Sequence, residues 1–399
     1  MKERNYSLAF LVSPVLGLIE AFSNLKRKHA ITVLFWFCLC FGICFSVGTK
    51  RTPGSIDGIS MRADFEKFKD ISAREYTAHL DNFLKFEGGA QDIYIVTVAY
   101  VVGKFTDNYH FFFLVLAFVF AYFQLKCLRY FVRIKNYTSS AICIILACLF
   151  LWNNIFNING ARFWTASWIA LLCVFKTFID DKPRYIAISL LIAFVHISFA
   201  VFPLILLAGY LLKHSDKPLL ILFCISWLFS VFVEDLQLTP FKDLDLPFNI
   251  MKKVEAYTEG AYADEPEEGT GFYWVHLLFG VISRHYMDIL ILLIALNRNK
   301  VRGRRAHAIV GMMLVLAIVS NFGMIMPVFG RRFFAVNYAL VAYSFLLTFG
   351  DKKYGMFIYM LPLAWFMNLF YLIKDTIYVL DAGFLLPPIF SFIRFAIAA

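Results

Sequence analysis

Three arginines stand at the start of apolar runs, where side chains capable of ionic chemistry are rare. Arg162 opens the run NGARFWTASWIALL, and Arg331 and Arg332 open the run GRRFFAVNYALVAY. A guanidinium at the end of a membrane helix needs water, phosphate or a carboxylate to face. Its planar fork binds phosphate oxygens through two parallel hydrogen bonds at any physiological pH. These arginines therefore predict an anion-binding site, although anchoring to lipid headgroups is an equally good interpretation from the residues alone.

Three further residues could transfer a proton in such a site. His196 lies in the middle of a long apolar run, and an unperturbed imidazole titrates close to neutral pH. Glu87 and Asp92 precede another apolar run, and each carboxylate could accept a proton from a hydroxyl. Structural interpretations compete with these roles. His196 could satisfy a backbone group at a helix break, Asp92 could favour a helix start through the dipole, and Glu87 could be a loop charge.

The composition places all of these residues in a membrane protein. Of 399 residues, 60% are hydrophobic and 17% are charged, and the mean hydropathy is +0.69. No soluble core could bury this much apolar surface. Apolar stretches of about 14 to 20 residues recur along the chain, so we expect an all-α, polytopic membrane protein with about ten to thirteen transmembrane helices. Residues 1–399 should form one transmembrane domain, with larger external loops at 49–108 and 234–272.

The distribution of charge orients the chain. Basic loops at 25–30, 126–137 and 297–307 should be cytoplasmic, and the acidic segment 234–271 should lie outside. Basic residues confined to short turns do not form a nucleic-acid surface, so we expect no nucleic-acid partner. The basic start of the chain resembles a signal peptide without a cleavage site, and we expect an uncleaved interfacial or spanning helix there.

Counting crossings between these loops gives two further expectations. Only one net crossing fits between the external residues after 48 and the basic loop at 126–137, so 92–105 should be a re-entrant or external-side helix. Residues 184–212 should be two short helices that break near His196 and Ser198. This topology places Asp57 and the ionisable residues named above at the outer face, beside the aromatic side chains of Trp152, Trp164 and Phe329.

The eight cysteines lie within or beside apolar runs and not at metal-ligand spacing with histidines. Buried cysteine commonly serves as a small hydrophobic residue. We therefore expect neither a disulfide framework nor a metal site.

Five segments, in this order along the chain, resemble the EpsG-like branch of the Wzy-type polysaccharide polymerases. They are GTKRTPGSIDGISMRADFEKF (48–68), EGGAQDIYIVTVAYVVGKFTDN (87–108), NGARFWTASWIALL (159–172), LLIAFVHISFAVFPLILL (190–207) and GRRFFAVNY (330–338). The resemblance implies a multi-pass glycosyltransferase of the bacterial inner (cytoplasmic) membrane. Such enzymes join polyprenyl-pyrophosphate-linked oligosaccharide repeat units at the outer face, as in O-antigen or capsule synthesis.

The resemblance also implies roles for the residues in these segments. Pyrophosphate would be bound by Arg162, Arg331 and Arg332, and the sugar by Asp57, Arg62 and Trp164. The catalytic residues would be His196, Glu87 and Asp92. No cofactor is implied, because the pyrophosphate itself is the leaving group. The implied partners are the lipid-linked glycan, membrane lipids, a chain-length regulator and a flippase.

Other membrane functions remain alternatives at this point. An O-antigen ligase or an acyltransferase would also act on glycans, and a flippase or other transporter would move the lipid-linked oligosaccharide. Transporters commonly contain paired repeats, and none is evident in this sequence. An acyltransferase would need its histidine near a cytoplasmic acyl donor, whereas His196 is expected outside.

Overall fold

The computed structural model describes most of the chain, and the described part is helical. The described residues are 8–48, 57–85, 93–134, 153–233, 273–301, 303–325, 327–349 and 377–397. Within these ranges the β-type pairing consists of one isolated antiparallel bridge, between Phe45 and Leu380. The all-α prediction is confirmed.

The chain divides into two compact units. The first unit contains Met1–Ala78, Asp92–Ile169 and Gly355–Ala399, and the second contains His79–Gln91 and Ala170–Tyr354. One transmembrane domain over residues 1–399 stays a prediction.

The described helices include several that are suited to a bilayer. Among the described residues, the helices that are both long and apolar enough to cross a membrane are Tyr109–Val132, Ile155–Phe178 and Arg304–Ile325. Shorter apolar helices include Lys28–Cys44 and Ile197–Leu212. The chain is thus a helical membrane protein, and the expected total of about ten to thirteen crossings stays a prediction.

Aromatic side chains form the core of the first unit. Helix α3 (Lys28–Cys44) packs along α7 (Tyr109–Val132). The rings of Phe45 and Phe113 are 4.6 Å apart, and those of Phe41 and Phe156 are 4.9 Å apart. Such pairs add about 0.5–1.5 kcal/mol each beyond the burial of their area. The other elements of this unit include α1 (Leu8–Val12), α2 (Pro14–Ser23), η1 (Ile155–Gly160), the start of α9 (Ala161–Phe178), η8 (Ala382–Leu385) and α18 (Pro388–Ile397).

Three short helices occupy the segment expected to be an external loop: α4 (Asp57–Phe68), α5 (Ala73–Leu84) and α6 (Tyr94–Gly103). The first turn of α5 is closed by a capping box, in which Ser72 N–H donates to Glu75 Oε2 and Glu75 N–H donates to Ser72 Oγ. Stacked rings of Tyr76 and Tyr100, 4.4 Å apart, join α5 to α6. With ten residues, α6 is about 15 Å long, half of a hydrocarbon core. This length agrees with the expectation that 92–105 does not cross the membrane.

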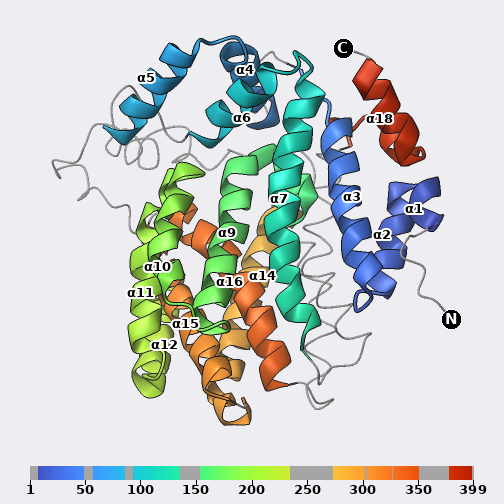
Figure 1. Ribbon diagram of the computed structural model, residues 1–399. Helices are drawn as coiled ribbons and strands as arrows, with labels where there is room; N and C mark the ends of the chain where they lie inside the picture. The colour runs from blue at the N-terminus through green and yellow to red at the C-terminus, as the bar shows by residue number, and fades with distance from the viewer. Residues whose placement is uncertain are drawn as a thin grey trace. The chain divides into compact units, whose positions relative to one another are not determined.

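The second unit is built from long helices on both sides of a broken segment. The break separates α10 (Arg184–Ile188) and η2 (Ser189–Phe194) from η3 (Ile197–Val201) and α11 (Phe202–Leu212). The predicted break near His196 is therefore confirmed. The remaining elements include α12 (Asp216–Phe232), α14 (Tyr273–Leu296), η5 (Arg298–Lys300), α15 (Arg304–Phe322), η6 (Gly323–Ile325) and α16 (Pro327–Thr348). Helix α15 packs against α11, α12 and α16, as Figure 1 shows.

Candidate functional site

In the first unit, Asp57 and Trp164 both lie close to Gly160. The backbone N–H of Gly58, at the start of α4, donates to Asn159 Oδ1 at 2.8 Å and so holds α4 against the end of η1. A Cβ built on Gly160 would lie 3.1 Å from Trp164 Cδ1 and 3.9 Å from Asp57 Oδ2. The absence of a side chain at Gly160 thus keeps a carboxylate and an indole close together. A carboxylate and an indole close together can hydrogen-bond and stack on a sugar.

Arg162 belongs to the same part of the first unit. It is the second residue of α9, two residues after Gly160 and two before Trp164, and it is half-buried. The α9 start therefore contributes both a predicted anion-binding residue and a predicted sugar-binding residue, next to the α4 start that contributes Asp57.

Arg62 has protein partners of its own. Its Nη1 donates to the carbonyl of Val47, and its guanidinium lies 3.7 Å from the centre of the Tyr109 ring. The Tyr109 hydroxyl is in turn 3.2 Å from Ser46 Oγ. These contacts tie α4 to the end of α3 and the start of α7. Arg62 therefore positions α4, and the sugar contact expected of Arg62 stays a prediction.

In the second unit, His196 caps the helix that follows the break. Its backbone is extended, with φ −156° and ψ 118°, and its Nδ1 accepts the Ser198 backbone N–H at 3.2 Å. A neutral imidazole has one acceptor nitrogen and one donor nitrogen, so Nε2 carries the proton when Nδ1 accepts. This geometry favours His196 as a hydrogen-bond donor through Nε2. To act as a general base at Nε2, the neutral ring would have to carry its proton on Nδ1 and lose the hydrogen bond from the Ser198 N–H.

Arg332 connects α16 to the same break. Its Nη1 donates to Ser198 Oγ at 3.2 Å. The rings of Phe199 and Phe333 are 5.5 Å apart and fix η3 against α16. We call His196, Ser198 and Arg332 the break cluster. Arg331, the neighbouring residue, is exposed, whereas Arg332 is half-buried. Arg332 can therefore stabilise the break cluster, and Arg331 is the member of the pair that can contact a ligand.

Comparison with known proteins identifies the family. Residues 33–386 match the EpsG family, and this range contains Asp57, Arg162 and the whole break cluster. The chain belongs to the EpsG family. No curated protein and no solved structure matches it. Membership supports a polysaccharide polymerase-like function in a membrane.

The carboxylates predicted to act in catalysis, Glu87 and Asp92, lie outside the described residues. Their roles therefore stay predictions. Asp57 is the carboxylate of the predicted set whose surroundings the structure describes.

The structure of this EpsG-family chain contains a polar cluster around Asp288 that was not predicted from the sequence. Asp288, in the middle of α14, is fully buried, with Arg284 close enough to interact electrostatically and the Asn321 side chain beside it. The Arg284 guanidinium carbon lies 5.9 Å from the centre of the Phe334 ring on α16. Asn337 of α16 is also fully buried. The sequence feature that could have indicated this cluster is an arginine and an aspartate four residues apart inside an apolar run. Such residues are neighbours on a helix, and charged residues inside a membrane helix mark functional or structural sites.

The His196 geometry gives a prediction that separates donor from base. His196→Asn places an amide oxygen where Nδ1 accepts, so the cap survives and Nε2–H is lost. His196→Gln extends an amide N–H toward the position of Nε2. If Nε2–H binds substrate, we expect His196→Asn to leave mainly single repeat units on the carrier and His196→Gln to retain part of the polymer, as measured by gel ladders of lipid-linked glycan. Equal loss in both variants, at normal protein level, would instead indicate base catalysis.

Proposed function

We propose that this EpsG-family chain is a Wzy-type polymerase, which joins polyprenyl-pyrophosphate-linked oligosaccharide repeat units at the outer face of the bacterial inner membrane. The observation that carries the proposal is the hydrogen bond from Arg332 to Ser198 Oγ. It joins two distant segments into one cluster that offers a guanidinium, a hydroxyl and an imidazole N–H. These are the groups that bind a phosphate or a sugar hydroxyl.

The reaction explains why arginines are needed. The acceptor hydroxyl oxygen bonds to the anomeric carbon, the bond from that carbon to the pyrophosphate oxygen breaks, and the hydroxyl proton passes to a base. Negative charge grows on the leaving pyrophosphate, so donors that are already in place lower the barrier. We assign Arg162 in the first unit and Arg331 in the second to phosphate binding. Glu87 or Asp92 would accept the proton, and Asp57 and Trp164 would hold sugar.

Cells that lack this protein test the function. A polymerase defect should leave single repeat units on the lipid carrier, exposed on the outer leaflet. A build-up of the same units on the cytoplasmic leaflet would instead support a flippase. Full-length polymer that is no longer attached to its final acceptor would support a ligase.

The orientation of the chain gives a separate prediction. Ala78 on α5 and Lys217 at the start of α12 are both exposed. In a background without the eight native cysteines, we expect Ala78→Cys to react with an impermeant thiol reagent applied from outside. We expect Lys217→Cys to react only after the membrane is permeabilised, because the segment KHSDK (213–217) that follows the apolar run 184–212 should be cytoplasmic. Outside labelling of Lys217→Cys would contradict the proposed orientation.

A further inference from the structure

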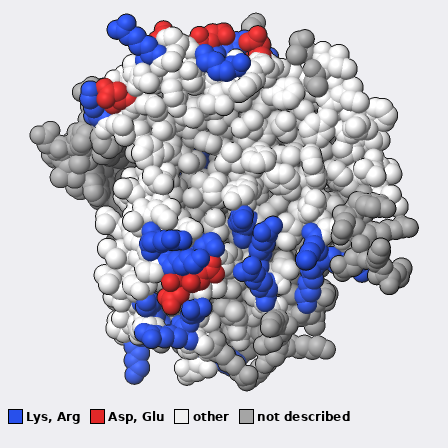
Figure 2. Space-filling view, in the orientation of Figure 1, with Lys and Arg blue, Asp and Glu red and all other residues white. Residues whose placement is uncertain are grey.

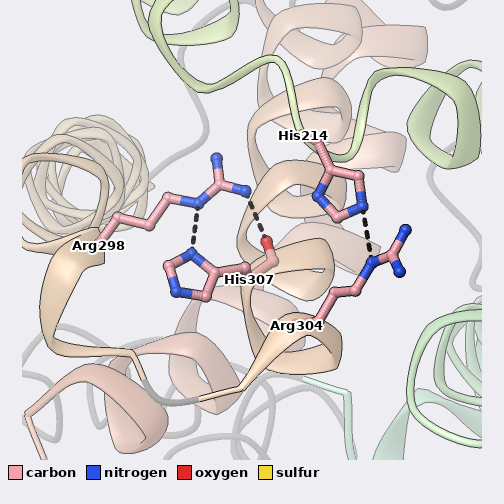
Figure 3. Close-up of a pocket in the computed structure, with 4 residues that line it drawn as sticks. All are labelled: His214, Arg298, Arg304 and His307. Carbon is pink, nitrogen blue, oxygen red and sulfur yellow. Dashed lines mark hydrogen bonds between the residues drawn. The ribbon is translucent and has the colours of Figure 1, made fainter.

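A basic pocket opens where α11 ends and α15 begins, within the second unit. Two adjoining cavities, of about 330 and 300 Å³, share His214 and Arg304 as lining residues (Figure 3). Four lysine and arginine side chains and one carboxylate line them. The cations are Lys213, Arg298, Arg304 and Arg305, and the carboxylate is Asp181. The pocket therefore carries a strong positive excess.

The base of the pocket is held in place by Arg298, which is 5% exposed. Its Nη2 donates to the carbonyls of Lys213 and His307, both at 2.9 Å, and its Nε donates to His307 Nδ1 at 3.2 Å. Figure 3 shows the two contacts with His307, and it shows Arg304 Nε donating to His214 Nε2 at 3.4 Å. The pocket is thus preformed by contacts between the loop before α15 and the end of α11.

Exposed apolar side chains lie next to the pocket residues along the chain. Leu211 is 70% exposed and directly precedes Leu212 and Lys213, and Leu296 is 63% exposed and lies two residues before Arg298. Lys213 Nζ lies 3.5 Å from the centre of the Tyr210 ring. An apolar helix surface that ends in tyrosine and basic residues is typical of the headgroup level of a bilayer. Figure 2 shows basic side chains gathered around acidic ones at the lower left, near the end of α9.

We propose that the basic pocket binds the phosphate of an anionic phospholipid headgroup in the cytoplasmic leaflet. The positive-inside rule places the loops on both sides of this pocket at that leaflet. A soluble phosphate compound could use the same N–H donors, but it would not need exposed leucines within two residues of the basic side chains in the chain. This binding is independent of the polymerase reaction.

The full chain in detergent, mixed with equal amounts of phosphatidylglycerol and phosphatidylcholine, tests the proposal by native mass spectrometry. The wild type should retain phosphatidylglycerol selectively. Each basic residue at such a surface contributes about 5-fold in affinity, so Lys213→Gln with Arg304→Gln should weaken retention about 25-fold. The matched control, Lys126→Gln with Arg129→Gln, removes two charges from the end of α7 and should retain the lipid. Arg298 is left unchanged because it holds the pocket together.

Three results would overturn the proposal. These are equal retention by the wild type and the pocket variant, equal loss in the control, and displacement of the lipid by an excess of inorganic pyrophosphate, which would indicate a soluble ligand. If the double variant unfolds at a lower temperature, Arg304→Gln alone replaces it. That side chain is exposed, and its loss should still weaken retention about 5-fold.

Discussion

Arg162→Lys should reduce polymerisation about 100-fold or more while protein level and membrane insertion stay normal. Lysine keeps the positive charge but loses the planar fork that binds two phosphate oxygens at once. Removing one preorganised donor from a developing anion typically costs about 100- to 1,000-fold in rate. Arg331→Lys should have a similar effect, because Arg331 is the exposed member of its pair. Initial rates of repeat-unit joining in isolated membranes would measure both.

Arg394→Lys provides the matched control. Arg394 is also an arginine of an apolar helix, but it pairs with Asp381, with Nη1 and Oδ1 3.0 Å apart, and no role in the reaction is assigned to it. Its replacement should leave the rate unchanged. Wild-type polymer length in both Arg162→Lys and Arg331→Lys would show that these arginines are only headgroup anchors, and the proposed mechanism would be wrong.

Asp288→Ala should destabilise the second unit by about 1–3 kcal/mol, because it leaves the half-buried Arg284 charge in α14 without its neighbouring carboxylate. Asp288 is fully buried, so water cannot readily replace the lost interaction. The midpoint of thermal unfolding in detergent, followed by size-exclusion chromatography, would show the loss.

The double variant Arg284→Leu with Asp288→Leu should recover most of this stability, since replacing both charges by apolar side chains leaves neither group without its counter-charge. Polymerisation by the double variant then decides whether the pair is structural or takes part in function. An Asp288→Ala variant as stable as the wild type would contradict an energetic role for the pair.

Local sequence features predicted two backbone features, one in each unit. The break at His196 followed from the length of the apolar run between the flanks DDKPR (180–184) and KHSDK (213–217), which should both be cytoplasmic. Pro203 soon after the break suits the first turn of α11. The short α6 followed from the same counting of crossings. Both features depend on helix length and loop charge, which the sequence displays directly.

The contacts between distant residues could not be predicted in the same way. Nothing in the sequence shows that the Arg62 guanidinium lies over Tyr109, or that Arg332 reaches Ser198, 134 residues away along the chain. These contacts depend on how whole helices pack. The sequence did place an ionisable histidine and arginines in separate apolar runs, and within the second unit the fold brings His196 and Arg332 into one cluster.

Purified protein in liposomes tests the central claim most directly. The liposomes would contain lipid-linked repeat units as the sole glycan, with no nucleotide sugar, and the products would be separated by length. The wild type should give a ladder of two or more repeat units on one carrier, and Arg162→Lys should give mainly single units. Single units alone with the wild-type protein, together with movement of the lipid-linked unit between leaflets, would contradict a polymerase and identify a transporter.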